Sequence, residues 1–405
     1  MRLTYRSGGE SHGKGMVAIL EGLPKGLAID TDAIDAQLAR RQRGYGRSGR
    51  QQIERDRVEV LGGVRHGKTL EAPLVLFVAN KDTSIESMPE PTRPRPGHAD
   101  LSGCYRHGDR DIRANIERSS ARETCARVAA GAVAQQLLAA LGAEVLGHVV
   151  GIGDAFARDP SEEPGSAFAG LETFEHARAA IAASDFGVLD GAREPALRAA
   201  IDAAIRDKDS LGGVVEVVAR GVPAGLGSFA QWDQRLDGRL AQALLSIPAF
   251  KSVEIGLGHV AAQRPGSRVH DEIGRDGTRL VRRSNAAGGI EGGVTNGQLL
   301  VVRGAKKPIA TLRRRLASVD LATGDDAPAA FERSDVCAVP AAACIAEAMV
   351  ALVLAGAALE LYGGATMSQF VAAHDWHVRE VARIDACGEA GGGTRGAVGP
   401  GPVSA

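Results

Sequence analysis

The longest apolar segment of the chain, residues 340–362, places the strongest constraint on how the chain can fold. Its length would suit a membrane span, but it contains Glu347 and Glu360, so it predicts a helix buried in a protein core. The chain is long and apolar enough to form such a core, because it has 405 residues and 44% of them are hydrophobic. Such a core is also large enough to exclude water from a binding site.

The organisation along the chain favours one large domain. Length alone would allow two or three domains, but no internal repeat and no clear linker divides the sequence. We therefore expect a single folded domain over residues 1–365 and a C-terminal extension, helical or irregular, over residues 366–387. Residues 388–405 are rich in Gly and Pro and predict a disordered tail.

Local patterns predict several helices, strands and loops in this domain. A helix is expected over residues 31–41, with strands at 58–61, 74–79 and 299–303. Four prolines between residues 89 and 96 predict a long loop over residues 80–118. Ser120 and Glu123 have the spacing of a capping box, which predicts a helix from Ser120 to about Leu141.

Arginine and glycine usage points to anion binding in loops. Of the 48 basic residues only eight are Lys, yet the formal net charge is -1, so no global nucleic-acid or membrane partner is expected. Arginines gather at 40–57, 93–122 and 303–315, among glycines and prolines. Loops of this composition bring N–H groups and guanidinium groups to a compact anion such as a phosphorylated small molecule. A solvated surface and an arginine-rich RNA-binding protein remain the alternatives.

Two short motifs match catalytic patterns but lack the required context. Residues 62–69 match the phosphate-binding loop GxxxxGK[ST], which needs a following helix, whereas Pro73 and a strand-like run follow here. Residues 62–69 therefore predict a hairpin turn between two strands. The alternative is a nucleotide-driven protein, which nucleotide binding that is lost in Lys68→Ala would support. Residues 9–13 match GxSxG, but strand sequence follows where a nucleophile elbow needs a helix, which disfavours a serine hydrolase.

The remaining chemistry-bearing residues favour acid–base chemistry without a metal. His12 and His98 each lie in a glycine-containing loop close to arginines, and imidazole titrates near neutral pH. Neither histidine has metal-ligand spacing, and the pair His374 and His377 suits a surface, so no metal site is expected. The five cysteines, at 104, 125, 337, 344 and 387, show no zinc spacing. With no signal-peptide pattern at the start, they predict reduced thiols in a cytoplasmic protein.

Several of these features together resemble the chorismate synthase family. The motifs that carry the resemblance occur in order: Gly-Glu-Ser-His-Gly at 9–13, Arg-Pro-Gly-His-Ala-Asp at 95–100, Glu-Arg-Ser-Ser-Ala-Arg-Glu-Thr at 117–124, Ala-Gly-Gly-Ile-Glu-Gly-Gly at 287–293, Lys-Pro-Ile-Ala-Thr at 307–311 and Arg-Ser-Asp at 333–335. The similarity runs from residue 1 to about residue 365. Independent multi-residue motifs in a fixed order make it far more specific than either short motif above.

The resemblance implies a fold, a reaction and a cofactor. The fold would be an α+β sandwich, with helices between large antiparallel sheets, assembled as a homotetramer. The reaction would be the anti 1,4-elimination of phosphate from 5-enolpyruvylshikimate 3-phosphate to give chorismate. It would require reduced FMN without net redox change. NADPH would act only indirectly, through an external flavin reductase.

The resemblance also implies roles for individual residues. His12 would protonate the departing phosphate with Ser11 beside it, His98 would act at the reduced flavin, and Asp335 with Ser120 would assist proton removal. The implied FMN contacts are Ser120, Ala121, Arg122, Pro248, Ala249, Gly292, Lys307, Pro308, Ile309, Ala310, Thr311 and Arg333. The implied substrate contacts are Arg41, Arg47, Arg50, Arg95, Arg122 and Arg333, with Arg41 and Arg47 alternatively assigned to NADP. Two positions depart from the family pattern: His107, where an aromatic residue is usual, and Pro248, where Asn is common.

Overall fold

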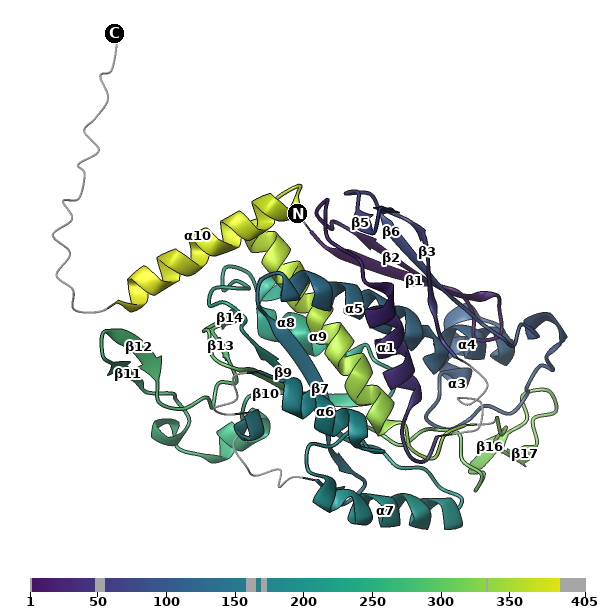
Figure 1. Ribbon diagram of the computed structural model, residues 1–405. Helices are drawn as coiled ribbons and strands as arrows, with labels where there is room; N and C mark the ends of the chain where they lie inside the picture. Colours follow the sequence, from purple (N-terminus) through teal and green to yellow (C-terminus); the bar gives the residue numbers. More distant parts are fainter. Residues whose placement is uncertain (1, 48–54, 158–164, 169–172, 333, 387–405) are drawn as a thin grey trace, which may run out of the picture.

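Two antiparallel sheets enclose a layer of helices in this computed structural model, which describes residues 2–47, 55–157, 165–168, 173–332 and 334–386 (Figure 1). The first sheet has the order β1-β2-β6-β3 and the second the order β10-β15-β9-β7-β8. The strands of the first sheet are β1 (Thr4–Gly8), β2 (Gly15–Glu21), β3 (Val58–Gly62) and β6 (Leu74–Ala79). The strands of the second are β7 (Glu144–Ile152), β8 (Ala155–Phe156), β9 (Gly213–Arg220), β10 (Phe250–Ile255) and β15 (Leu300–Lys306). This arrangement confirms the predicted α+β class with large antiparallel sheets.

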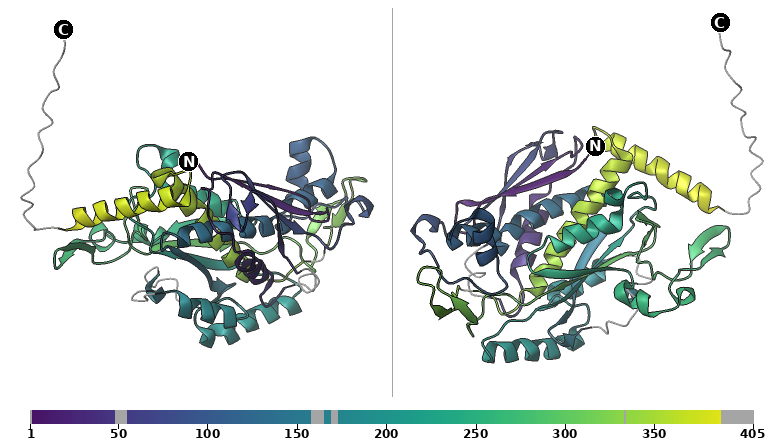
Figure 2. Two further views of the ribbon diagram at one scale, coloured as in Figure 1. Left: turned by 45° about the horizontal axis from the view of Figure 1, so that its top comes forward. Right: turned by 180° about the vertical axis from the view of Figure 1, so that it is seen from behind.

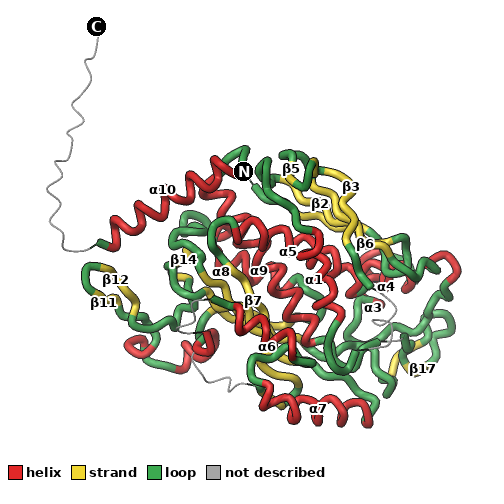
Figure 3. Tube along the Cα trace, in the orientation of Figure 1, coloured by secondary structure: helices red, strands yellow, loops and turns green. Residues whose placement is uncertain are grey.

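The helices between the sheets are α1 (Thr31–Gln42), α5 (Thr124–Ala139) and α9 (Val339–Tyr362), and α8 (Leu236–Leu245) packs beside α9. Further helices are α3 (Asp100–His107), α4 (Ile112–Ser119), α6 (Glu175–Ala183), α7 (Glu194–Arg206) and α10 (Met367–Asp385). Short two-stranded ribbons pair β4 (Val64–Arg65) with β5 (Lys68–Thr69), β11 (Ile273–Asp276) with β12 (Arg279–Arg282), β13 (Ile290–Glu291) with β14 (Val294–Thr295), and β16 (Ala317–Val319) with β17 (Asp326–Pro328). Two further views and the tube drawing show the same layering (Figures 2 and 3). α10 extends away from the sandwich, and the predicted tail over residues 388–405 lies outside the described residues.

The alternation of side chains explains why each sheet faces the helical layer. In the first sheet Met16, Ala18 and Leu20 on β2 are buried, and every second residue of β6 is buried beside them. The second sheet is covered on both faces. Val215 and Val217 belong to the core cluster of the helical layer, whereas Val218 packs with Phe168 and Phe174 on the outer side. Strands covered on both faces are apolar almost throughout, as β7 is.

α9 is the buried helix that the apolar segment predicts. It is long and apolar enough to cross a membrane, but its most apolar stretch of 18 residues is 94% buried inside the fold. Small residues let it approach its neighbours closely: a Cβ added at Gly131 of α5 would lie 2.3 Å from the Cβ of Ala348. Glu347 is fully buried, and its carboxylate accepts hydrogen bonds from Arg40 at 2.6 Å and from the backbone of Gly147 at 2.6 Å. The charge inside the apolar helix is therefore compensated rather than exposed.

The predicted long loop over residues 80–118 is wrong in its second half. The prolines are confined to residues 89–96, and α3 and α4 follow them. Ile112 and Ile116 are four residues apart on α4 and form a small apolar cluster with Cys104 of α3. These three side chains stabilise two short helices that the glycines and charges of this region obscure in the sequence.

A buried triad lies across the centre of the second sheet. Glu216 on β9 is paired in register with His148 on β7 and Arg303 on β15. Its carboxylate lies 3.3 Å from His148 Nε2 and 2.6 Å from Arg303 Nε. Burial raises the pKa of Glu216, but His148 and Arg303 outweigh it and lower that pKa to about 2. Arg303 therefore serves the sheet and not the anion-binding cluster in which the sequence placed it.

Acid should weaken the fold through Glu216. Its pKa is lower in the folded chain than its ordinary 4.5, so its stabilising contribution is present above pH 4.5 and is lost as the pH falls toward 2. In Glu216→Gln the midpoint of thermal unfolding, followed by circular dichroism, should fall less steeply than in the wild type between pH 4.5 and 3. Parallel curves for the two proteins over that interval would contradict the assignment.

Candidate active site

A cavity of about 880 Å³ opens where the first sheet, the helical layer and the loop after β15 meet. This volume is near the upper end of the range for small-molecule sites. Among its lining residues are most of those that the sequence singled out: Ser11, His12, Arg41, Arg47, Arg95, His98, Ser120, Ala121, Arg122, Pro248, Ala249, Lys307, Pro308, Ile309, Ala310, Thr311 and Asp335. Segments more than 300 residues apart in sequence therefore contribute to one site.

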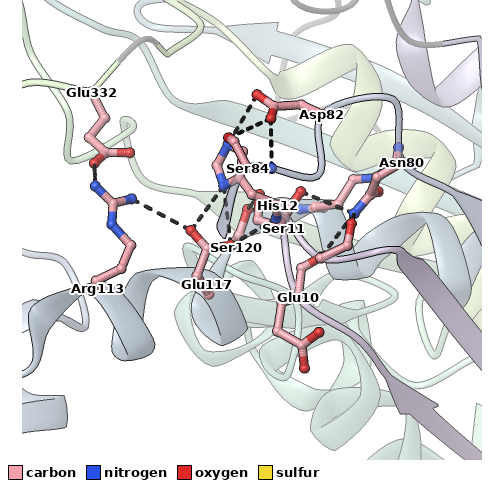
Figure 4. A network of polar contacts seen from close by, with 12 residues as sticks. Glu10, Ser11, His12, Asn80, Asp82, Ser84, Arg113, Glu117, Ser120 and Glu332 are labelled. Carbon is pink, nitrogen blue, oxygen red and sulfur yellow. Dashed lines mark hydrogen bonds and ion pairs between the residues drawn. The ribbon is translucent and has the colours of Figure 1, made fainter. Parts of the chain in front are cut away.

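The β1–β2 turn presents Ser11 and His12 to the cavity. Asn80, just after β6, holds the turn: its side-chain amide donates to the backbone oxygens of Glu10 at 3.0 Å, Ser11 at 3.2 Å and Gly13 at 2.8 Å (Figure 4). His12 is only 7% exposed. A turn held at three carbonyl groups gives the imidazole a fixed position.

The junction between α4 and α5 lies against this turn. Ser120 Oγ donates a hydrogen bond to Ser11 Oγ at 3.0 Å, and it accepts one from the backbone N–H of Arg122 at 3.2 Å. The predicted capping box does not form, because the carboxylate of Glu123 instead accepts from Ser7 at 2.8 Å and Arg127 at 2.7 Å. The helix accordingly begins with a short 3₁₀ turn, Ala121–Glu123, and continues as α5.

The Arg-Pro-Gly-His-Ala-Asp loop is organised by its last residue. Asp100 is fully buried, and its carboxylate receives Arg95 Nε at 2.8 Å, Arg95 Nη2 at 3.0 Å and His98 Nδ1 at 2.6 Å. Burial raises the pKa of Asp100, but the hydrogen bonds and charges of His98 and Arg95 lower it well below its usual range. Nδ1 of His98 is directed to this carboxylate, and its Nε2 lies 3.5 Å from Arg95 Nη2.

Two of the predicted substrate arginines share one buried carboxylate. Asp56 Oδ2 lies 2.5 Å from Arg41 Nη2, and Asp56 Oδ1 lies 2.6 Å from Arg122 Nη1. Arg122 also donates to Asn80 Oδ1 at 2.7 Å and to the carbonyl oxygen of Ala79 at 3.0 Å. Most N–H groups of the Arg122 guanidinium are thus hydrogen-bonded to the protein. Arg122 therefore stabilises the site and is less able to bind an anionic ligand.

Arg47 and Asp335 form an ion pair at the wall of the cavity. Arg47 Nη1 lies 2.9 Å from Asp335 Oδ2, and burial lowers the pKa of Arg47. Within the described part of the chain, no hydrogen-bond partner reaches the buried Nε atoms of Arg41 and Arg47. A buried donor without an acceptor is costly, so these two atoms favour an anionic or carbonyl-bearing ligand.

The end of β15 and the loop after it add two lysines to the site. Lys307 Nζ donates to the carbonyl oxygen of Gly97 at 2.5 Å, which joins this loop to the His98 loop. Lys306, the last residue of β15, belongs to the basic cluster 303–315 of the sequence and also lines the cavity. Burial and the neighbouring Arg47 and Lys307 outweigh nearby acidic groups and lower the pKa of Lys306 to about 8. An ammonium group of this kind can change charge near neutral pH.

Among the described residues, Gly292 is the predicted cofactor contact that does not line the cavity. Gly292 lies in the turn between β13 and β14, where its carbonyl oxygen accepts from Arg235 Nη1 at 3.1 Å. Arg50 and Arg333 lie outside the described residues.

The supporting carboxylates and amide are what sequence reasoning missed. Asp56, Asn80, Asp100 and Glu117 are all buried and each contacts a predicted site residue. Asp100 and Glu117 had a readable signal, because they lie within the motifs quoted at 95–100 and 117–124. The others come from segments whose proximity depends on the fold.

The structure also settles the context of the two misleading motifs. Residues 62–69 span β3, the β4–β5 ribbon and its turn, with no helix following, as the hairpin interpretation predicted. Residues 9–13 form the turn between β1 and β2, so Ser11 is not on a strand-to-helix elbow. Neither motif has the geometry that its catalytic counterpart requires.

Comparison with known proteins agrees with this geometry. The sequence model described as chorismate synthase matches residues 3–359. A chorismate synthase of Desulforudis audaxviator is 52% identical over 95% of this chain and 98% of its own length. One of Syntrophotalea carbinolica is 50% identical over 91% and 96%. A solved structure titled as the crystal structure of chorismate synthase superposes with a TM-score of 0.79 at 41% identity, covering 95% of this chain and 99% of that one.

The sequence and the fold thus match chorismate synthases over nearly the whole chain. This match shows the enzyme class, a lyase of the chorismate synthase type. The chain belongs to the chorismate synthase family.

Proposed function

We propose that the chain catalyses the anti 1,4-elimination of phosphate from 5-enolpyruvylshikimate 3-phosphate, yielding chorismate and inorganic phosphate with no net redox change. The observation that carries the proposal is one cavity that gathers His12, His98 and Asp335 with a cluster of arginines and lysines. The reaction breaks a C–O bond to phosphate and a C–H bond. It therefore needs a proton donor at the leaving group, a proton acceptor, and cations for a substrate bearing phosphate and carboxylates.

The residues fit roles of this kind. His12, held by its turn, would donate a proton to the departing phosphate oxygen, with Ser11 and Ser120 completing a hydroxyl pair beside it. Asp335 would accept a proton, and its contact with Arg47 keeps a cation next to it. Arg41, Arg47 and Arg95, together with Arg50 and Arg333, would bind the phosphate and carboxylates. A partly buried site strengthens each of these charge interactions.

Reduced FMN is the proposed cofactor. The cavity has room for more than one small ligand, and the unpartnered buried Nε atoms of Arg41 and Arg47 suit an anionic one. The residues that would hold FMN are Ser120, Ala121, Arg122, Pro248, Ala249, Lys307–Thr311 and Arg333, with His98 at the ring; Gly292 stays a prediction from the resemblance. When bound, reduced FMN supplies electron-rich flavin chemistry that no side chain has.

We further propose a cytoplasmic homotetramer that receives reduced flavin from an external NADPH-dependent reductase. Free, buried cysteines at 104, 125, 337 and 344 are typical of a reducing compartment. Phe229 and Trp232 are 81% and 83% exposed, which is typical of a surface that other subunits cover. NADPH oxidation by the purified protein with FMN and substrate, in the absence of a reductase, would contradict the external source.

Anaerobic turnover tests the proposed function. The purified protein is mixed with 5-enolpyruvylshikimate 3-phosphate and chemically reduced FMN, and chorismate absorbance and phosphate release are followed together. We expect the two products in equal amounts, and only when the flavin is reduced. A folded protein that gives no product under these conditions would refute the activity, and equal turnover with oxidised FMN would refute the cofactor requirement.

A further inference from the structure

Glu117 on α4 holds His12 at two points. Its Oε2 accepts the backbone N–H of His12 at 2.8 Å, and its Oε1 lies 2.9 Å from His12 Nδ1 (Figure 4). The backbone oxygen of Glu117 also accepts the N–H of Ser11 at 3.1 Å. Glu117 itself is 3% exposed. One buried residue thus fixes both the main chain and the ring of the proposed proton donor.

A second charged residue lies behind Glu117. Arg113 Nη1 is 3.5 Å from Glu117 Oε1, and Arg113 Nη2 is 2.8 Å from Glu332 Oε1. Arg113 also donates to the carbonyl oxygen of Pro89 at 3.0 Å, which anchors it. The charges alternate from Glu332 through Arg113 and Glu117 to His12, so the carboxylate of Glu117 is compensated and stays in place.

The contact decides which nitrogen of His12 faces the cavity. A carboxylate at Nδ1 keeps a proton on that atom, so Nε2 is the nitrogen available for exchange with a ligand. Among the described residues, the other charged group in contact with the ring is Asp82, whose Oδ2 lies 4.0 Å from Nε2 and whose side chain is 50% exposed. Glu117 is closer and buried, so it dominates the electrostatic environment of the imidazole.

We propose that Glu117 is a positioning residue for the reaction, which keeps the Nδ1–H tautomer of His12 and stabilises the imidazolium that donates its Nε2 proton. The proposal rests on the proposed function, because the donor role of His12 does. A purely structural role would only tie α4 to the β1–β2 turn. The two readings differ in what happens to the pH behaviour of His12 when the carboxylate becomes an amide.

The first test measures the chemical reactivity of the His12 imidazole and needs neither flavin nor turnover. The full chain is treated with diethyl pyrocarbonate, which attacks neutral imidazole, and modification of the His12 peptide is followed by mass spectrometry from pH 5 to 9. In Glu117→Gln the pH of half-maximal reactivity should move to a lower value, because the ring loses its buried carboxylate partner at Nδ1. An unchanged pH of half-maximal reactivity in folded Glu117→Gln would overturn the proposal.

The second test uses turnover and a double-mutant cycle. Glu117→Gln should lower kcat about 10–100-fold with KM within about threefold, and the alkaline limb of kcat/KM should move to lower pH. Added to His12→Ala it should cause no further loss, because it acts only through His12. A multiplied loss in the double variant would show a structural role and refute the proposal.

Control variants separate the possible failures. Glu10→Gln removes a carboxylate from the same turn whose side chain points away from His12 (Figure 4), and it should leave both readouts unchanged. If Glu117→Gln does not fold, Glu117→Asp keeps the charge but shortens the side chain. It should lower kcat and move the reactivity profile to lower pH, because the shorter side chain no longer brings the carboxylate to Nδ1, and an unchanged kcat with an unchanged profile would refute the proposal. If the reactivity profile of His12 differs between the wild type and Glu117→Gln as expected but the wild type forms no chorismate, the proposed function is refuted and the contact between Glu117 and His12 is not.

Discussion

Replacing His12 with alanine should lower the turnover of 5-enolpyruvylshikimate 3-phosphate by about 10²–10⁴-fold, which is the contribution of a positioned general acid. The imidazole lies in a turn that Asn80 and Glu117 hold from two sides, so its removal deletes a group without deleting the scaffold. We therefore expect kcat to fall far more than the substrate affinity. His98→Ala should also cut turnover sharply, because its ring is fixed by Asp100 at the cavity wall.

The measurement is anaerobic turnover with reduced FMN, beside circular dichroism and thermal unfolding of each variant. His107→Ala is the matched control: His107 is exposed at the end of α3 and does not line the cavity, so its turnover should stay within about twofold of the wild type. Near wild-type rates in both His12→Ala and His98→Ala would show that the roles assigned to the histidines are wrong.

Replacing Asp56 with asparagine should produce the largest loss of stability among the site residues. Its carboxylate lies between Arg41 and Arg122 at 2.5 and 2.6 Å, and its side chain is fully buried. Burial raises the pKa of Asp56, but the two guanidinium groups lower it overall, so the group is ionised at neutral pH. Removing the charge leaves two buried guanidinium groups without their counter-ion, which costs about 3–5 kcal/mol.

For a chain of this length that loss corresponds to a decrease of about 3–6 °C in the midpoint of thermal unfolding. Differential scanning calorimetry of wild type and variant at one protein concentration measures it, since assembly would make the midpoint concentration-dependent. Glu380→Gln, which removes an exposed i,i+3 pair with Arg383, should change the midpoint by less than about 1 °C. If Asp56→Asn unfolds at the wild-type temperature, the buried pair does not stabilise the site.

The same variant should also impair binding, because Arg41 lines the cavity and is oriented by Asp56. The stability effect and the activity effect therefore have one physical origin. This coupling is a consequence of the fold: residue 56 follows α1 closely in sequence, yet it meets Arg122 from the start of α5.

Much of the fold was predictable where local patterns agree with tertiary packing. The helix over 31–41, the strands at 58–61 and 74–79 and the buried apolar helix all occur within a residue or two of their predicted bounds. The predicted loop over 80–118 failed, because α3 and α4 owe their stability to a few contacts, such as Cys104 with Ile112, that no periodicity reveals. The predicted capping box at Ser120 does not form, because the carboxylate of Glu123 accepts hydrogen bonds from Ser7 and Arg127 instead.

The sequence by itself determined the main chemical groups of the candidate site, since ordered motifs with His12, His98, Asp335 and the arginines can be read directly from the chain, whereas Asp56 and Asn80 could not be. It also determined that a long helix must be buried. Only the tertiary structure decided how these groups act: which guanidinium is engaged by Asp56, which imidazole nitrogen faces the cavity, and that Arg303 belongs to the sheet. The reason is physical. The identity of a side chain is local, but its orientation and charge state depend on partners that lie close only once the chain has folded.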